Sequence, residues 1–137
     1  MTVQIFSNLP DSARLIRIAV FMEEQGFVDE FDALDETAVH AVMLDGDLPV
    51  ATCRFWPADD GWHVGRLAVI KAYRGRGIGR AMLEAAEDHI RALGGNSLSL
   101  HAQCRAQAFY QKCGYQAFGE TDYEEGVAHV QMVKKLI

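Results

Sequence analysis

The sequence predicts a mixed α/β fold with elements in the order β-α-(α)-β-β-β-α-β-α-β-β. Three observations support this prediction. Asp45-Gly46-Asp47 lies between two apolar segments, which is typical of a β-hairpin. Apolar residues recur every three or four positions through residues 78–93, which predicts an amphipathic helix. Segments typical of strands flank that helix at 66–70 and 97–101. We expect one domain over residues 1–137.

The N-terminal part predicts an edge strand followed by a helix. Residues 2–7 alternate in the manner of a strand at the edge of a sheet. Asp11 or Ser12 can cap a helix that runs to about Gln25, because the next residue is a glycine that can end it. Residues 27–37 are acidic and irregular, with room for a short helix.

The hairpin strands are predicted at 38–44 and 50–56, and a third strand follows at 62–70. The apolar pattern of this third strand changes phase. Val64 lies on one face, whereas Leu67 and Val69 lie on the other. Because the change occurs next to Gly65, we predict a β-bulge there.

The C-terminal half alternates helices and strands. Apolar residues of the 78–93 helix form one stripe, and two glycines end it. A short strand is predicted at 97–101, and a helix from 103 to 113. Strands at 115–118 and 127–133 are expected to enclose an acidic loop.

The composition excludes several classes of protein. Half of the residues are hydrophobic and the net charge is −6, so no basic face for nucleic acid is expected. No segment approaches the ~20 apolar residues that span a bilayer, and the start lacks a secretory leader. No membrane partner is therefore expected. The three cysteines lack metal-ligand spacing, which predicts reduced thiols in a cytoplasmic protein without a metal.

Acidic residues gather in two places, at 23–36 and at 122–125. They can be solvated loops. They can also form a negative field that concentrates a cationic amine. Both interpretations remain open from the sequence.

The segment Tyr73-Arg74-Gly75-Arg76-Gly77-Ile78-Gly79-Arg80 predicts a phosphate site. It connects a strand to the start of a helix, where several N–H groups lack an internal partner and the helix dipole favours an anion. Glycines allow close approach to the backbone. Arginines add charged donors.

Three motifs compete for this segment. A nucleotide P-loop requires a lysine that is absent here, and the dinucleotide fingerprint requires a third glycine where Arg80 stands. The pattern Arg/Gln-x-x-Gly-x-Gly/Ala is matched by Arg74, Gly77 and Gly79. This is the pyrophosphate loop of the acyl-CoA N-acyltransferases of the GNAT superfamily, which the chain resembles.

A second match supports the resemblance. Residues 103–115 resemble the later family motif Asn-x-x-Ala-x-x-Phe/Leu-Tyr-x-Lys-x-Gly-Phe, with Gln103 in place of Asn and Tyr115 in place of Phe. The resemblance implies a mostly antiparallel sheet with a splayed central strand, flanked by about four helices. It also implies acetyl-CoA as co-substrate. The residues expected to bind it are Leu67, Ala68, Val69, Arg74, Gly75, Arg76, Gly77, Ile78, Gly79, Arg80, Gln103 and Tyr110.

The implied reaction is transfer of an acetyl group to a primary amine of a small molecule by direct attack. Backbone amides near Leu67 to Val69 are expected to stabilise the oxyanion. The family position of Tyr110 implies that its phenol is the general acid for the departing CoA thiolate.

The general base is not defined by the motifs, because residues 62–70 contain no carboxylate. Glu24, at the end of the first helix, is our first candidate. His40, His101 and His129 are alternatives, and their scattered spacing gives no metal signature. Two further residues are expected to shape the acceptor pocket, namely Arg54 and Glu125.

Other functions remain open. A CoA-binding sensor without catalysis would also use the phosphate loop, and an acetyltransferase of protein N-termini or lysines would differ only in its acceptor groove. A Rossmann-type dehydrogenase fits least well. A homodimer is possible, since dimers are common among proteins that the chain resembles. The acceptor's identity and the acyl-chain preference are not defined by the sequence.

Overall fold

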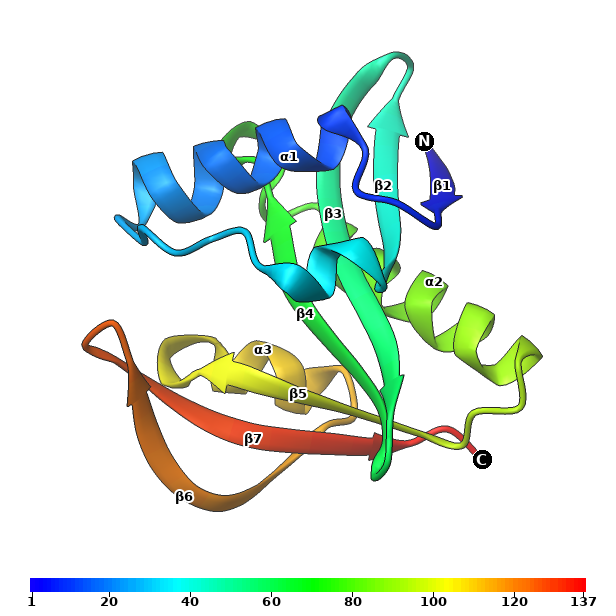
Figure 1. Ribbon diagram of the computed structural model, residues 1–137, viewed down its shortest axis with the longest axis vertical. Coiled ribbons are helices and arrows are strands. Elements are labelled where there is room, and N and C mark those ends of the chain that lie inside the picture. The colour runs from blue at the N-terminus through cyan, green and yellow to red at the C-terminus, as the bar shows by residue number, and fades with distance from the viewer.

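A computed structural model describes all 137 residues and contains one seven-stranded sheet in the order β1-β2-β3-β4-β5-β7-β6 (Figure 1). Only β4 and β5 are parallel, and every other neighbouring pair is antiparallel. The mixed, mostly antiparallel α/β fold predicted from the sequence is therefore confirmed. The strands are β1 (Thr2–Phe6), β2 (Val39–Asp45), β3 (Leu48–Ala58), β4 (Gly61–Val69), β5 (Ser97–Gln103), β6 (Gln116–Glu124) and β7 (Val127–Lys135).

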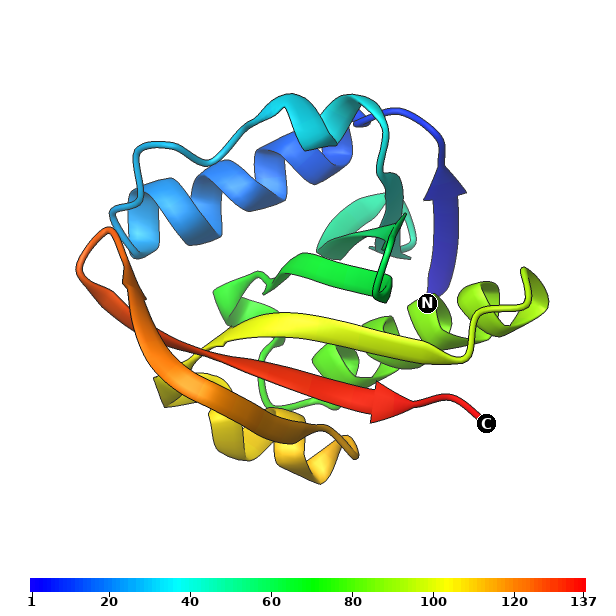
Figure 2. The same cartoon turned by 60° about the horizontal axis from the view of Figure 1, so that its bottom comes forward.

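The helices cover both faces of the sheet. In Figure 2, α1 lies above the sheet, and α2 and α3 lie below it. There are three α-helices where about four helices were expected, and the segment 33–36 forms one 3₁₀ turn. None of the helices has both the length and the apolarity that a bilayer-spanning helix requires. The helical elements are α1 (Asp11–Arg17), the π-helical η1 (Ile18–Glu24), η2 (Ala33–Glu36), η3 (Lys71–Tyr73), α2 (Ile78–Ala92), η4 (Cys104–Ala106) and α3 (Gln107–Lys112).

The first predicted helix changes its geometry midway. It is α-helical to Arg17 and continues as a π-helix from Ile18 to Glu24, with the Gln25 N–H bonded to the Val20 carbonyl. Gly26 follows with φ +81°, so the predicted glycine stop is confirmed. A π-helical segment is rare and is frequently found at functional sites.

The apolar stripe of α2 packs against the sheet. Ile78, Met82, Ala86 and Ile90 are buried in the larger of two core clusters, as the helical spacing predicted. Leu93 is the exception, because it follows the end of the helix and is 59% exposed.

The predicted β-bulge lies in β4. Thr52 of β3 pairs with Ala68, whereas Arg54 pairs with Gly65, so three residue steps on β4 oppose two on β3. Arg66, directly after the predicted position, has φ +55°. For a residue with a side chain this left-handed conformation is uncommon, and such strain gathers at functional sites.

The central strands separate where the sequence resemblance implied a splay. β4 pairs with β5 only over Trp62–Val64, and the two strands then diverge (Figure 1). Beyond Val64, the edge of β4 that faces β5 has no strand partner. The splay opens a space bordered by backbone groups.

Two predicted boundaries near the C-terminus are wrong. Gln103 is the last residue of β5 rather than the first of a helix, and α3 begins only at Gln107. β6 continues through most of the predicted acidic loop to Glu124, and the turn is only Glu125-Gly126, both with positive φ. The hydrophobic pattern of the sequence did not predict the full length of this strand, because all nine β6 residues are exposed and show no apolar alternation.

Candidate active site

The turn before α2 leaves a row of backbone donors without partners. The N–H groups of residues 75–80 have no acceptor within the protein, and the first helical bond is from Ala81 to the Gly77 carbonyl. Gly75 and Gly77 both have φ +77°, which a side chain would strain. This succession of donors therefore depends on the two glycines.

The space in front of the turn fits a polyanionic group. A Cβ placed on Gly75 or Gly77 would meet no atom within 4 Å, so the turn borders open space at both glycines. Several N–H groups at the positive end of a helix form an anion-binding concavity. The turn therefore has the chemistry to hold a polyanion such as a diphosphate.

The three arginines of the turn differ in their partners. The Arg76 guanidinium lies over the Tyr73 ring, 4.7 Å from its centroid, and makes no ion pair. Arg80 pairs with Glu84 at 3.1 Å on the exposed surface of α2. Arg74 is engaged most strongly, because it bonds both Glu24 and the Val69 carbonyl.

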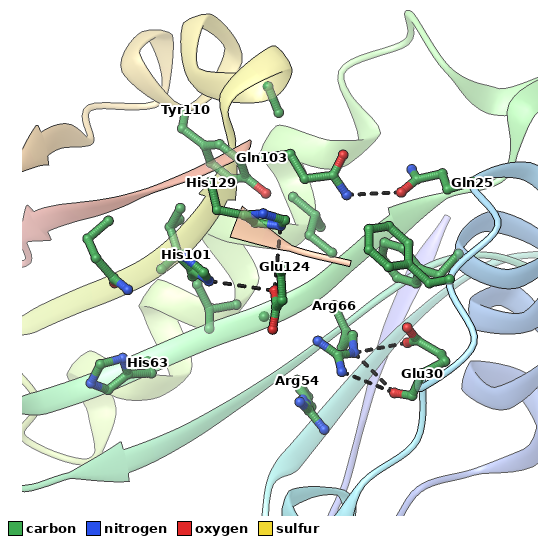
Figure 3. A pocket seen from close by; sticks show the side chains of 18 of the residues that line it. Gln25, Glu30, Arg54, His63, Arg66, His101, Gln103, Tyr110, Glu124 and His129 are labelled. Atoms are coloured by element: carbon green, nitrogen blue, oxygen red, sulfur yellow. Dashed lines mark hydrogen bonds and ion pairs between the residues drawn. The ribbon is translucent and has the colours of Figure 1, made fainter. Parts of the chain in front are cut away.

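A pocket of about 410 Å³ opens beside the splay of β4 and β5 (Figure 3). It brings together seven of the residues predicted for the site: Arg54, Leu67, His101, Gln103, Tyr110, Glu125 and His129. The other predicted residues do not line it, namely Glu24, His40, Ala68, Val69 and the seven residues 74–80 of the phosphate turn.

Tyr110 extends from α3 into this pocket. Its ring packs edge-on against Phe109 and Tyr115, with centroids 5.1 and 6.1 Å away. Its hydroxyl makes no hydrogen bond within the protein and points into the pocket (Figure 3). Burial, with smaller effects of Cys53 and Cys113, raises the pKa of Tyr110. The phenol therefore remains protonated at neutral pH and can donate a proton.

Gln103 connects the end of β5 to the end of the first helix. Its Nε2 donates to Oε1 of Gln25 at 2.9 Å, and its Oε1 accepts from Nε of Arg105 at 2.6 Å (Figure 3). The amide is therefore held in one orientation beside the splay.

Glu24 lies against the phosphate turn. Its two carboxylate oxygens each accept a 2.6 Å hydrogen bond from Arg74. These bonds lower the pKa of Glu24, which makes it a weaker base. Its role as general base remains an untested prediction.

His40 is a buried residue of β2. Its Nε2 donates to the Asp35 carbonyl at 2.9 Å, and burial lowers its pKa. The ring is enclosed and holds the η2 turn against the sheet. Because it does not line the pocket, the structure gives it a packing contact rather than a contact with an acceptor.

Arg54 belongs to a neutral network of three arginines and three carboxylates. Its Nη1 lies 2.6 Å from Asp32 and 2.9 Å from Asp35. Its Nε is buried without a partner. The predicted acceptor contact of Arg54 therefore has to compete with these ion pairs. The network comprises Arg17, Glu30, Asp32, Asp35, Arg54 and Arg66.

Two histidines and a glutamate form the wall of the pocket opposite Arg66. Nε2 of His101 bonds Oδ1 of Asp122 at 2.6 Å, and Nδ1 of His129 bonds the Val127 carbonyl at 2.7 Å. Both rings approach Glu124 (Figure 3). At the adjacent turn, Glu125 accepts a 3.2 Å bond from the Val28 N–H.

Several lining residues were missed in the sequence, namely Gln25, Glu30, Arg66 and Glu124. Glu124 could have been predicted from the sequence if β6 had been extended through the acidic segment, because Asp122 and Glu124 are two residues apart and alternate residues of a strand share a face. Arg66 could not have been predicted, since its place in the pocket depends on the bulge. No group of three or more His, Cys, Asp or Glu side chains has the geometry of a metal site.

Comparison with known proteins agrees with this geometry. The family model of the acetyltransferase (GNAT) domain matches residues 17–136. The uncharacterised N-acetyltransferase YjcF of Bacillus subtilis is 34% identical over 123 residues, covering 87% of this chain and 87% of that protein. The chain therefore belongs to the GNAT acetyltransferase family.

Solved structures have the same fold. A proposed N-acetyltransferase from Lactobacillus plantarum has 38% identity and a TM-score of 0.90, with 100% of both chains covered. An aminoglycoside 6'-N-acetyltransferase complexed with coenzyme A has a TM-score of 0.78, with 100% of this chain and 98% of that chain covered. Its 16% identity shows a likeness of fold alone.

Proposed function

We propose that the protein transfers the acetyl group of acetyl-CoA to the primary amine of a small molecule. The observation that supports this most is the order of three features: a row of free N–H donors, a splay between β4 and β5, and a phenol at the pocket. The complex of a structural neighbour with coenzyme A supports the same co-substrate.

The residues present fit such a co-substrate. The N–H groups of residues 75–80 would hold the diphosphate, with Arg76 as the unpaired cation of the turn. The unpartnered edge of β4 after Val64 would bond the pantetheine amides, and Gln103 would border them. Bound acetyl-CoA supplies an activated thioester, so the protein has to position the amine and stabilise charge.

Direct attack by the amine is favoured over an acetylated enzyme. None of the three cysteines lines the pocket. Burial raises the pKa of Cys53 to about 12, so it carries almost no thiolate at neutral pH. A covalent route would need such a thiolate next to the thioester.

Tyr110 is proposed as the general acid. Its hydroxyl is free of other hydrogen bonds, faces the pocket and stays protonated. A thiol has a lower pKa than this phenol, so proton transfer from Tyr110 to the thiolate is unfavourable by itself. The transfer requires a hydroxyl that is positioned at the sulfur, and it is completed when water reprotonates Tyr110.

The test is an amine panel assayed with a thiol reagent that detects free CoA. The proposal expects amine-dependent release of CoA and an acetylated amine in the mass spectrum. Binding of acetyl-CoA without release for any amine would instead support a sensor. Release only with peptide amines would support modification of proteins.

A further inference from the structure

Three hydrogen-bond acceptors face one another on one wall of the pocket. Oε2 of Glu124 lies 3.7 Å from Nδ1 of His101 and 3.6 Å from Nε2 of His129 (Figure 3). The two imidazole centroids are 4.7 Å apart. Side chains from β5, β6 and β7 therefore direct one oxygen and two nitrogens to a common point.

The outer hydrogen bonds define the tautomers of both rings. Nδ1 of His129 bonds the Val127 carbonyl, which only accepts, so this nitrogen carries the hydrogen. Nε2 of His101 bonds the Asp122 carboxylate, so it carries the hydrogen as well. In the neutral rings the nitrogens that face Glu124 therefore have lone pairs.

This arrangement lacks donors. With both rings in these neutral tautomers, three acceptors face one another at distances beyond an ordinary hydrogen bond and with no hydrogen between them. A primary ammonium group carries three N–H donors and a positive charge, which is the complement of one carboxylate and two lone pairs. A quaternary ammonium has the charge without the donors.

We infer that Glu124, His101 and His129 bind the amine substrate as a primary ammonium ion, and that His101 removes a proton from this ammonium before acetyl transfer. The catalytic part of this inference rests on the proposed function. The acceptor class is then a primary alkylamine that is protonated in solution.

His101 is assigned as the base because a carboxylate orients it. Nε2 of His101 donates a 2.6 Å hydrogen bond to the Asp122 carboxylate, which fixes the ring with Nδ1 toward Glu124, whereas the partner of His129 is a neutral carbonyl. Asp122 acts through His101 and is a positioning residue. Its side chain is 59% exposed, so the accepted proton can leave to water.

The proton and electron balance is simple. One N–H proton of the ammonium passes to Nδ1 of His101, and the freed nitrogen lone pair forms the new N–C bond. The C–S bond of the thioester breaks, the thiolate takes the Tyr110 proton, and the acylated nitrogen loses a second proton to water to become a neutral amide. His101 loses its proton to solvent and Tyr110 regains one from it, so one proton is released overall.

The base is surrounded mostly by negative charge. Asp122 and Glu124 of β6 and His129 of β7 contact His101 directly. The remaining charged or titratable side chains that line the same pocket are Asp29, Glu30, Arg54, His63, Arg66, Arg105, Tyr110 and Glu125.

The binding step can be tested without turnover. The full chain labelled with ¹⁵N-histidine is titrated near neutral pH with methylammonium chloride, and separately with tetramethylammonium chloride. The inference expects saturable shifts of Nδ1 of His101 and Nε2 of His129 with methylammonium only. Glu124→Gln should abolish or weaken them about ten-fold or more, because hydrogen bonds to charged groups are strong.

Three outcomes would overturn the ammonium site. Equal shifts with both cations would show a general effect of ionic strength, and no shift with either would show that no such site exists. Stoichiometric metal in the purified protein that is lost in Glu124→Gln would make the trio a metal site. These outcomes are separate from a failure of acetyl transfer, which the amine panel measures.

The role of His101 is tested with the amine that the panel identifies. His101→Gln should lower kcat about 100-fold or more while the KM for acetyl-CoA stays nearly unchanged, because only the base is removed. Asp122→Asn should also lower kcat without changing that KM, because Asp122 acts through His101. Unchanged kcat in both variants would exclude His101 as the base.

A matched control lies at the turn between β3 and β4. Asp60 makes a comparable 2.7 Å bond to Nε2 of His63, and Asp60 does not line the pocket. Asp60→Asn should leave both kcat and the methylammonium response unchanged. An equal loss in Asp60→Asn and Asp122→Asn would show that such pairs act only on stability.

Discussion

The carboxylate of Glu24 accepts two hydrogen bonds of 2.6 Å from the guanidinium of Arg74. This pair connects the end of the π-helical segment η1 to the phosphate turn. Glu24 does not line the pocket, and its pKa is lowered by the Arg74 hydrogen bonds. The relationship gives Arg74 an acidic partner that a phosphate would have to replace.

Glu24→Gln is expected to retain turnover, because the carboxylate does not line the pocket. The KM for acetyl-CoA should fall or stay the same, since Arg74 becomes free to contact phosphate. Steady-state kinetics with both substrates varied would check this. If turnover instead fell about 100-fold while acetyl-CoA binding stayed unchanged, Glu24 would be restored as the general base.

Tyr110→Phe should lower kcat about ten-fold or more while leaving CoA binding nearly unchanged, because only the proton donor is removed. The ring contacts with Phe109 and Tyr115 are preserved. Phe109→Leu is a suitable comparison, since it changes packing next to Tyr110 without removing a proton donor. Equal turnover in wild type and Tyr110→Phe would exclude the phenol as general acid.

Gly77→Ala should weaken acetyl-CoA binding, because a side chain strains φ +77° and relief of that strain would shift the neighbouring N–H donors. Gly46→Ala is the matched control. Gly46 has φ +61° in the β2–β3 turn, and a Cβ added there would also meet no atom within 4 Å.

Calorimetric titration with CoA would separate the two glycine variants. Both should lose about 1 kcal/mol of stability from backbone strain. Only Gly77→Ala should show a higher Kd for CoA. Equal affinity in both variants would contradict a phosphate cradle at this turn.

Asp35→Asn should destabilise the protein by about 3 kcal/mol, because Arg17 and Arg54 would remain buried with one carboxylate fewer. Asp32→Asn should cost less than about 1 kcal/mol, since the Asp32 side chain is 43% exposed. Urea unfolding measures both. Similar losses in the two variants would show that burial does not decide the strength of these pairs.

The same network predicts an acid transition. Burial alone would raise the pKa of Asp35, but hydrogen bonds from Arg17, the Asp32 N–H and Arg54 lower it to about 2. Because this folded pKa lies below the unfolded value, the stabilisation is complete above about pH 4 and is lost as pH falls toward 2. Asp35→Asn should lack this part of the acid dependence of the free energy of unfolding.

The sequence was sufficient for features that rest on local chemistry. The glycines of the turn at 75–79, the apolar stripe of α2 and the phase change beside Gly65 all have direct physical causes, and the structure contains each of them. The placement of Tyr110 in the pocket agrees with its position in the motif at 103–115.

The acceptor side of the pocket was less predictable, because it is assembled across strands. The proximity of His101 and His129 depends on the register of β5 with β7, in which Gln103 opposes His129 and His101 opposes Gln131. No local pattern encodes that register. Glu124 reaches both rings only because β6 extends to a two-residue turn.

The most direct test of the account is a crystal structure of the protein with coenzyme A. We expect the diphosphate oxygens within about 3.2 Å of N–H groups of residues 75–80, and the sulfur within hydrogen-bonding reach of the Tyr110 hydroxyl. A diphosphate bound elsewhere, or a sulfur directed away from Tyr110, would contradict it.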